Sequence, residues 1–197
     1  MPTARSKTES GDRRFGSLPS LRSTTVFLSL GSNLGDRREY LRQAVAELPN
    51  HGLQPRRISS LYETEPVGLP GGSLSQPWFL NGVVEGTTAF DPWALLHSLL
   101  ALERAHGRQR SGIRPLPRTL DLDIILYGSE RRQTPQLTLP HPCYRQRRFV
   151  LAGMAELAPE RIDPEIGMSM AELEANCPDL GQVRKVEGPE WALLPGS

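Results

Sequence analysis

Two aspartates inside an apolar stretch are the side chains of this sequence whose spacing points most directly to chemistry. Asp121 and Asp123 lie within Leu120–Leu126 and are separated by one leucine. Residues i and i+2 of a β-strand face the same way, so the carboxylates would lie side by side while their apolar neighbours face the core. Adjacent carboxylates repel each other unless a proton or cation lies between them. Magnesium binds through one or two carboxylates together with substrate phosphates. Two acids on a solvated strand give the same pattern, so the motif alone does not decide.

Four arginines precede this acidic stretch within one expected loop, namely Arg108, Arg110, Arg114 and Arg118. Guanidinium groups bind phosphate oxygens through charge-assisted and often bidentate hydrogen bonds. Beside paired acids, they predict a site that grips a polyphosphate both directly and through magnesium. A solvated charge run is the alternative, and four arginines directly before an acidic strand make it less favoured. The sequence has neither a Walker lysine loop nor a GxGxxG segment, which argues against a P-loop site.

A second group of residues has the composition of a small-molecule pocket. Asn81 interrupts an apolar strand, and a buried amide needs hydrogen-bond partners. Phe79 and Phe149 would ordinarily belong to a core, yet an amide between two aromatic rings can recognise a flat heterocycle. His141 follows a proline in a turn, where it is either a surface residue or a donor to phosphate.

The segment Gly31–Asp36 joins the first expected strand to the first expected helix. Its glycines permit unusual backbone dihedrals, and its polar residues can cap a helix. We favour a tight strand-to-helix turn. The functional alternative is a wall of a small-molecule pocket at a helix N-terminus.

The elements that must hold these residues can be read from periodicity and capping. Apolar and β-branched runs predict strands, and apolar residues at helical spacing predict helices. We expect strands at 24–30, 57–62, 79–87 and 119–127, helices at 36–48, 91–107 and 147–157, a hairpin or edge segment near 136–139 and a helical segment at 168–175. The first six elements follow the order β-α-β-β-α-β. That order is typical of a ferredoxin-like α+β sandwich, an antiparallel sheet with helices packed on one face.

We expect one domain over residues 23–160, with a disordered arm at 1–22 and a peripheral C-terminal extension at 161–197. The arm has almost no apolar residues, so it cannot bury enough surface to fold. Long loops are expected at 65–77 and 108–118. Loops of this length in a compact domain are usually functional, and we expect both to close over bound substrates.

Composition narrows the class of protein. The chain has 197 residues, 38% of them hydrophobic, and a formal net charge of +1, which gives no chain-wide nucleic-acid footprint. Its cysteines, Cys143 and Cys177, are too few for a disulfide framework and read as thiols of a reducing cytosol. No apolar run has membrane-spanning length, and no apolar stretch of a secretory signal follows the basic N-terminus. We expect a cytoplasmic monomer that binds neither nucleic acid nor membranes.

Six stretches in order make the chain resemble the 6-hydroxymethyl-7,8-dihydropterin pyrophosphokinase family over residues 25–160. They are LGSNLGDR, SSLYETEPVG, WFLNGVV, LERAHGRQR, PRTLDLDIILYG and LTLPHPCYRQRRFVLAGMAELAP. Any one of them is weak evidence, but the six together are highly specific. The resemblance implies the ferredoxin-like fold. It also implies transfer of a diphosphate from ATP to the hydroxyl of the pterin, with release of AMP, in folate synthesis.

The resemblance also implies roles for individual residues. It makes Asp121 and Asp123 the ligands of two magnesium ions, and it makes Arg108, Arg110 and Arg118 the arginines that grip the phosphates. Together with Arg110 and Arg118, the ATP side takes Glu103, Ile124, Thr138, His141 and Arg147. The pterin side takes Thr64, Val67, Phe79, Asn81 and Phe149, with the two phenylalanines flanking the ring.

Some positions depart from the family pattern. The acidic strand follows Leu116-Pro117-Arg118 where the family usually has Gly-Pro-Arg, and Pro115 stands where some relatives have Trp. Glu65 replaces a proline of some relatives. Phe79 replaces a tyrosine of some relatives, which keeps the stacking surface and loses a hydroxyl. These differences bear on loop closure and affinity rather than on the type of reaction.

Two other classes of protein share parts of the pattern. Nucleotidyltransferases also pair Gly-Ser with DxD, but close together in sequence, whereas about ninety residues separate Ser32 from Asp121 here. Such an enzyme would release pyrophosphate instead of AMP. RNA-recognition domains share the β-α-β-β-α-β order, but they need exposed aromatics on central strands, and the first strand offers only Phe27.

Overall fold

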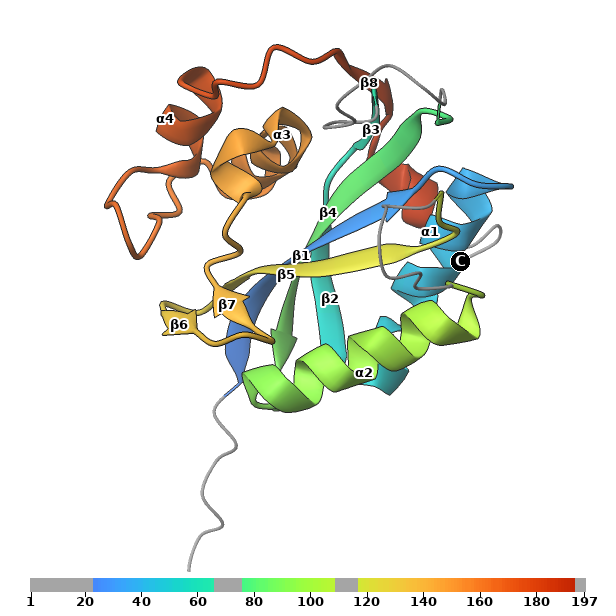
Figure 1. The fold of residues 1–197 in the computed structure, drawn as a ribbon, viewed down its shortest axis with the longest axis horizontal. Coiled ribbons are helices and arrows are strands. Elements are labelled where there is room, and N and C mark those ends of the chain that lie inside the picture. The colour runs from blue at the N-terminus through green and yellow to red at the C-terminus, as the bar shows by residue number, and fades with distance from the viewer. Residues whose placement is uncertain (1–22, 66–75, 109–116, 194–197) are drawn as a thin grey trace, which may run out of the picture.

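The computed structural model describes residues 23–65, 76–108 and 117–193, and an antiparallel sheet lies at its centre (Figure 1). Five strands follow the order β5-β1-β4-β3-β8, and β2 also pairs with β4. All of these pairs are antiparallel. The strands are β1 (Thr24–Ser32), β2 (Leu53–Ile58), β3 (Leu61–Thr64), β4 (Phe79–Thr88), β5 (Asp121–Tyr127) and β8 (Val183–Glu187).

Helices cover the sheet, and a small hairpin extends from it. The helices are α1 (Arg37–Glu47), α2 (Pro92–Ala105), α3 (Arg148–Leu157) and α4 (Met170–Ala175), with the 3₁₀ turns Leu48–His51, Tyr144–Gln146 and Pro189–Ala192. The hairpin consists of β6 (Arg132–Gln133) and β7 (Thr138–Leu139). Local chemistry starts the first two helices. The Asp36 carboxylate accepts a hydrogen bond from the Glu39 amide, and Asp91 caps α2 with Pro92 at its first position.

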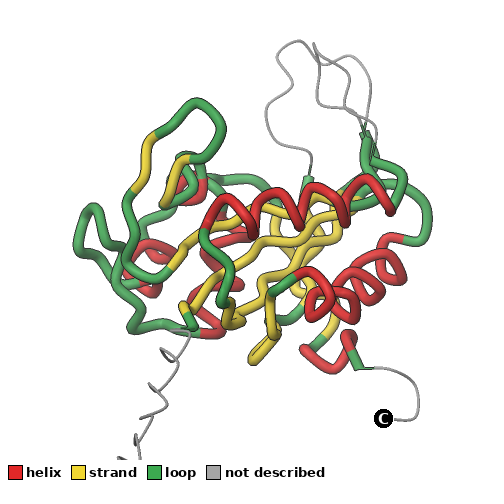
Figure 2. Tube along the Cα trace, turned by 90° about the horizontal axis from the view of Figure 1, so that it is seen from below, coloured by secondary structure: helices red, strands yellow, loops and turns green. Residues whose placement is uncertain are grey.

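One face of the sheet packs against α1 and α2 and forms the larger hydrophobic core. Alternate residues of the central strands point into it, including Leu28, Leu30 and Leu122, and the helices add Leu41 and Leu99. Seen from below, the long helix α2 runs across the strands (Figure 2). Burial of these side chains at about 25 cal/mol per Å² of apolar surface is the main stabilising contribution to the fold.

The opposite face is only partly covered. One half of this face packs against α3 and α4 through a second apolar cluster that includes Phe27, Val83, Ile125 and Leu151. On its other half, the same strands carry polar side chains instead, and these line a cavity. The two helices expected on one face are there, while α3 and α4 cover part of the other.

The expected element order is confirmed, with one difference in the second strand. The segment predicted as one strand at 57–62 is the end of β2 and the start of β3. Ser59 causes the break. Its hydroxyl accepts a hydrogen bond from the Val83 amide at 2.8 Å, a position that a backbone carbonyl would otherwise fill.

The C-terminal residues were expected to be peripheral, but the described part of them packs into the domain. Strand β8 pairs with β3, and its Glu187 forms an ion pair with Arg38 of α1 at 2.7 Å. Trp191 is fully buried, and its indole nitrogen donates to the Ser59 carbonyl at 2.8 Å. The sequence Val183–Glu187 is mostly charged, so it carries a weak strand signal. The domain boundaries remain a prediction.

Some expectations fall outside the described residues. These are the arm at 1–22 and most of both predicted loops, since residues 66–75 and 109–116 are not described. Across the described ranges, no helix is long and apolar enough to cross a membrane.

Candidate active site

Strand register places Asn81 and Asp121 on either side of a glycine. Asn81 of β4 is the partner of Gly31 in β1, and Gly31 is the partner of Asp121 in β5. Neighbouring strands lie about 4.8 Å apart, so roughly 10 Å separates the outer two backbones. A Cβ atom at Gly31 would lie 2.8 Å from the Asn81 side-chain oxygen. Glycine therefore leaves the floor of the site open between the amide and the acid.

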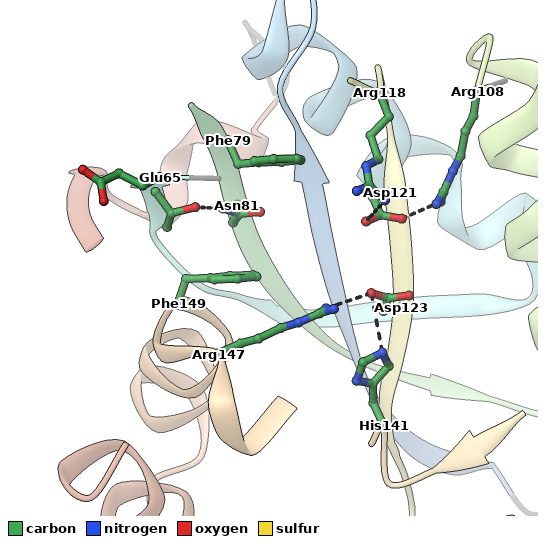
Figure 3. A pocket seen from close by; sticks show the side chains of 11 residues that line it. Glu65, Phe79, Asn81, Arg108, Arg118, Asp121, Asp123, His141, Arg147 and Phe149 are labelled. Atoms are coloured by element: carbon green, nitrogen blue, oxygen red, sulfur yellow. Dashed lines mark hydrogen bonds and ion pairs between the residues drawn. The ribbon is translucent and has the colours of Figure 1, made fainter. Parts of the chain in front are cut away.

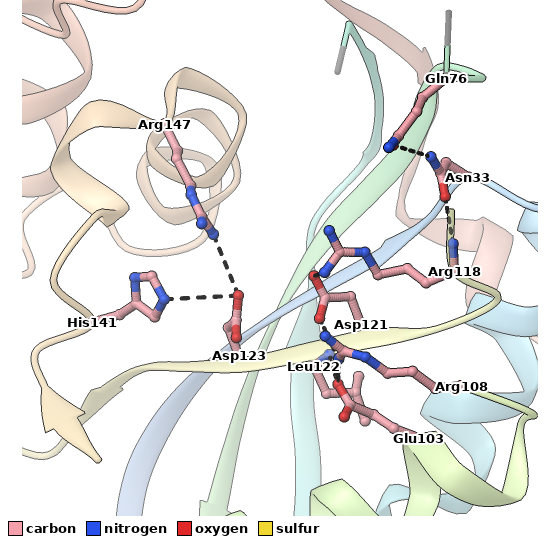
Figure 4. Close-up of polar contacts among 10 residues, drawn as sticks. All are labelled: Asn33, Gln76, Glu103, Arg108, Arg118, Asp121, Leu122, Asp123, His141 and Arg147. Atoms are coloured by element: carbon pink, nitrogen blue, oxygen red, sulfur yellow. Dashed lines mark hydrogen bonds and ion pairs between the residues drawn. The ribbon is translucent and has the colours of Figure 1, made fainter. Parts of the chain in front are cut away.

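Asp121 is held by two arginines from the ends of the expected basic loop. Arg118 approaches one carboxylate oxygen at 2.9 Å, and Arg108 contacts the other (Figures 3 and 4). Arg108 also pairs with Glu103 of α2, which is 1% exposed. Glu103 further accepts a hydrogen bond from the Leu122 amide at 2.8 Å. Glu103 therefore lies behind the acidic strand and orients Arg108, instead of lining the cavity itself.

Asp123 has a different set of partners. Arg147, which precedes α3, approaches its carboxylate at 3.3 Å, and His141 lies 3.8 Å away (Figure 4). Burial lowers the pKa of His141 although the charge of Asp123 acts in the opposite direction. The imidazole is therefore mostly neutral near pH 7, and the cationic partner of Asp123 there is Arg147.

Two aromatic rings face each other across a gap at the other end of the cavity (Figure 3). Phe79 comes from the start of β4 and Phe149 from the first turn of α3. Asn81 lies between them, and its amide nitrogen donates to the Thr64 hydroxyl at 2.8 Å. Both polar residues are 3% exposed. Because Thr64 takes the nitrogen, the side-chain oxygen of Asn81 is the atom turned toward the floor at Gly31.

These residues enclose a cavity of about 280 Å³. Its lining contains most of the residues that the sequence predicted for the two substrates, namely Thr64, Phe79, Asn81, Arg108, Arg118, Asp121, Asp123, His141, Arg147 and Phe149. Glu65, one of the departures from the family pattern, lines it as well. Val67 and Arg110 lie outside the described residues, as do the departures at Pro115 and Leu116.

A second cavity of about 320 Å³ adjoins the first. It lies between α2, β5 and the segment that ends in β7, and it contains the predicted ATP-side residues Ile124 and Thr138. Asp123 and His141 line both cavities. A ligand long enough to occupy both cavities would therefore lie beside Asp123 where the two meet.

Asn33 connects the chain segments on both sides of the site, a role that sequence analysis did not identify. It is 1% exposed, and its side-chain oxygen accepts the Arg118 amide at 2.7 Å. Its nitrogen donates to the Gln76 side chain at 3.3 Å (Figure 4) and to the Pro77 carbonyl, also at 3.3 Å. The GSN segment was visible in the sequence, but these partners are 43 to 85 residues away along the chain.

The donor set fits magnesium. Asp121 and Asp123 present oxygen ligands on one face, next to open space, with side chains 20% and 33% exposed. Among the described residues, no group of three or more His, Cys, Asp or Glu side chains is arranged to hold a metal. A magnesium ion at this place would therefore need further oxygens from a substrate, which is how that ion is bound at phosphate-transfer sites.

Comparison with known proteins decides the family. The sequence model of 7,8-dihydro-6-hydroxymethylpterin-pyrophosphokinase (HPPK) matches residues 27–159. The chain belongs to this family. It is thus a pyrophosphokinase of folate synthesis.

Individual members of the pyrophosphokinase family agree with this assignment. The 2-amino-4-hydroxy-6-hydroxymethyldihydropteridine pyrophosphokinase of Bacillus subtilis is 46% identical over 67% of this chain and 77% of its own length. The Pseudomonas aeruginosa protein of the same name is 40% identical, over 78% of this chain and 91% of its own. A folate synthesis bifunctional protein of Arabidopsis thaliana is 40% identical over 70% of this chain, which covers only 28% of the Arabidopsis protein.

A solved structure supports the fold. The crystal structure of wild-type Plasmodium falciparum HPPK-DHPS with pteroate superposes with a TM-score of 0.62 at 13% identity. The match covers 78% of this chain and 44% of the Plasmodium chain. At this identity the likeness concerns the fold alone, and it agrees with an α+β ferredoxin-like fold.

Proposed function

We propose that this enzyme uses the residues around Asp121 and Asp123 to transfer the terminal diphosphate of ATP to the hydroxyl of 6-hydroxymethyl-7,8-dihydropterin. The observation that carries this assignment is the meeting of two cavities at Asp123 and His141, with arginines on both sides. One cavity is flanked by aromatic rings and the other by apolar side chains, so two substrates can approach a shared charged strip.

The second cavity is assigned to the adenosine part of ATP. Leu96, Leu100 and Ile124 give it apolar walls, and Thr138 and Gln136 add polar groups. From there the triphosphate would run past Asp123 toward Asp121. Arg147 lies beside the first acid and Arg108 and Arg118 beside the second, so the chain of phosphates would meet cations along its whole path.

The pterin is assigned to the gap between Phe79 and Phe149. A flat heterocycle there would stack on both rings, and the Asn81 oxygen would accept a hydrogen bond from a ring N–H. The Thr64 hydroxyl fixes the orientation of that amide, so the acceptor is set before the ligand arrives. Gly31 leaves room for the hydroxymethyl arm to reach toward Asp121.

The reaction forms a bond between the pterin oxygen and the β-phosphorus of ATP and breaks the bond from that phosphorus to the bridging oxygen of AMP. The hydroxyl proton is lost as that bond forms and passes to the solvent in the net reaction. Arg108, Arg118 and Arg147 would orient the phosphates and neutralise charge, and the enclosed site would exclude water. Magnesium held by Asp121 and Asp123 would supply further charge neutralisation on the phosphates and on the attacking oxygen.

The products test this proposal. Purified enzyme with magnesium, ATP and the hydroxymethyl-dihydropterin should form AMP and a pterin diphosphate in equal amounts. Chromatography and ³¹P NMR measure both products. Without the pterin, AMP should not form. Release of pyrophosphate would instead indicate a nucleotidyltransferase, and ADP would indicate transfer of a single phosphate, and either result would overturn the assignment.

Finer points belong to the same proposal. We propose two magnesium ions per site, since two carboxylates face the phosphate path, and a titration of activity against magnesium with two distinct phases would support that number. We also propose a cytoplasmic monomer. Cys143 and Cys177 are both free thiols, in keeping with a reducing compartment. Light scattering in solution measures the mass directly.

A further inference from the structure

Helix α3 carries Phe149 and Glu156 on the same side. Phe149 lies in its first turn and Glu156 seven residues later, near its end. Seven residues are close to two full turns, so these two side chains project from the same face of the helix, about 10 Å apart along its axis. Phe149 faces the cavity. Whatever holds Glu156 therefore also sets the direction in which Phe149 points.

The Glu156 carboxylate accepts hydrogen bonds from strand β3 and from Ser60, the residue just before that strand. One carboxylate oxygen accepts from the Ser60 amide at 3.0 Å and from the Tyr62 hydroxyl at 2.6 Å. The other accepts from the Ser60 hydroxyl at 2.6 Å and from Lys185 of β8 at 3.4 Å. Four donors thus meet on one carboxylate whose side chain is 25% exposed. Hydrogen bonds to a charged acceptor are the stronger ones in proteins.

The donors share a strand face with the pterin pocket. Ser60, Tyr62 and Thr64 alternate along the chain, so their side chains point to the same side of the sheet. Thr64 lines the cavity and holds Asn81, and Tyr62 is the backbone partner of Asn81. The contact of Glu156 is therefore made to the same strand, on the same face, that carries the polar wall opposite Phe149.

Close packing fixes the distance between the helix and the sheet. Gly153, between Phe149 and Glu156, lies against β4, and a Cβ atom there would be 2.6 Å from a Val83 methyl carbon. The helix consequently sits as near to the strands as its backbone allows. Packing at Gly153 limits how close α3 can lie to the sheet, and the hydrogen bonds of Glu156 tie the end of the helix to the chain at β3.

The protonation state of Glu156 agrees with such a role. Burial acts to raise its pKa, but the hydrogen bonds from Ser60 and Tyr62 outweigh burial, and the pKa lies below the ordinary glutamate value. For Tyr62, burial and the hydrogen bond to Glu156 both raise the pKa. A charged acceptor and neutral donors are thus the stable pairing at neutral pH.

We propose that Glu156 is a positioning residue for pterin binding, which locks α3 against β3 so that Phe149 closes the slot opposite Phe79 and Asn81. The proposal rests on the proposed function, because it assigns the heterocycle to that slot. Lys185 gives the C-terminal strand β8 a part in the same lock.

The first test compares affinities for the two substrates. Glu156→Ala should weaken binding of 6-hydroxymethylpterin, measured by calorimetry with magnesium and a non-hydrolysable ATP analogue, by about 10-fold. Affinity for the ATP analogue should stay within about twofold, since the second cavity does not involve this contact. Glu156→Gln keeps the shape and part of the bonding and should fall between. Glu160→Ala, at an exposed site just beyond the helix, serves as the matched control.

The second test distinguishes positioning from general support of the fold. If Glu156 acts through Phe149, then adding Glu156→Ala to Phe149→Ala should weaken pterin binding no further. Additive losses, or equal loss for both substrates, would overturn the proposal. If Glu156→Ala does not fold, Tyr62→Phe removes one donor and should show the same selectivity on a smaller scale. If the parent enzyme forms AMP and Phe149→Ala weakens pterin binding, but Glu156→Ala and Tyr62→Phe leave pterin affinity unaltered, the lock is refuted and the proposed function still stands.

Discussion

The two faces of the central sheet have different roles, although β4 and β5 contribute residues to both. On β5, Leu122 and Ile124 point into the apolar core under α1 and α2, while Asp121 and Asp123 point into the cavity. On β4, Leu80 and Val84 belong to the core, while Phe79 and Asn81 line the cavity. One face is therefore apolar throughout its packed area, and the other is open and charged where α3 and α4 do not cover it.

The difference shows how this chain separates stability from chemistry. Apolar burial in the core under α1 and α2 stabilises the fold without directional interactions. On the cavity side, both aspartates have cationic neighbours, since Asp121 pairs with Arg108 and Arg118, and Asp123 with Arg147. Partly exposed charges of this kind contribute little to folding. Substitutions in the cavity should therefore lower activity with little effect on stability. Substitutions in the core under α1 and α2 should lower stability with little effect on activity.

Loss of either cavity aspartate should have the largest effect on activity. Asp121→Asn and Asp123→Asn should each lower kcat by roughly 1000-fold, because they remove charge that acts on the transferred phosphates. The free energy of unfolding should change by less than about 1 kcal/mol, as expected for pairs near the surface. Steady-state kinetics at saturating magnesium and urea denaturation measure the two quantities. Turnover within a few-fold of the parent would contradict the assignment of these acids.

A substitution in the core under α1 and α2 should lower stability and leave activity nearly unchanged. Leu99 of α2 is 1% exposed, so Leu99→Ala should lower the free energy of unfolding by about 2–5 kcal/mol through lost burial and an internal cavity. Below the unfolding transition, kcat per folded molecule should stay within about threefold. Leu193→Ala, at a position 64% exposed, should change stability by less than about 0.5 kcal/mol. A large drop in kcat for folded Leu99→Ala would show that the faces are coupled.

Within the cavity side, the pterin wall should be separable from the phosphate strip. Asn81→Ala should weaken pterin binding by about 10- to 100-fold, since a hydrogen bond to the ligand is lost and Thr64 loses its partner. Binding of the ATP analogue should change by less than about twofold. Calorimetric titration of each ligand into this variant and into the exposed-site control Asn50→Ala makes the comparison. Equal weakening of both ligands would mean that Asn81 is a structural residue.

The connection between α3 and α4, the helices that cover the other half of this face, contains a buried acid away from the cavity. Asp163 is fully buried and accepts hydrogen bonds from Arg145 and Tyr144. Burial acts to raise its pKa, but the bonds from Arg145 and Tyr144 outweigh burial, so the pKa is lowered. A group whose pKa is lower in the folded state stabilises the fold above its unfolded pKa, and this contribution fades as the pH falls.

The expected result is a modest difference in acid sensitivity. The parent should lose melting temperature between about pH 5 and pH 2, and Asp163→Asn should lose less over the same range because it no longer carries this titration. Thermal unfolding across that pH range measures the slope. Identical slopes would show that Asp163 does not contribute to acid sensitivity, and kcat at neutral pH should change little in either case.

Much of this structure follows from local patterns in the sequence. Alternation along 119–127 correctly predicted that Asp121 and Asp123 share a face while Leu122 and Ile124 enter the core. Capping residues correctly placed the starts of α1 and α2 within a residue or so. These features depend on dihedral periods and on hydrogen bonds between near neighbours, which a single stretch of chain determines by itself.

Long-range pairing decided the rest. Only the register of three strands puts Gly31 between Asn81 and Asp121, and nothing local to any of those strands encodes which residues face each other. The mostly charged segment Val183–Glu187 becomes a strand because the edge of β3 offers it backbone partners, and Trp191 completes the core beneath. A carboxylate such as Glu156 acquires its donors only once helix and sheet have met. Periodicity sets the direction of a side chain, whereas tertiary packing selects the groups that it contacts.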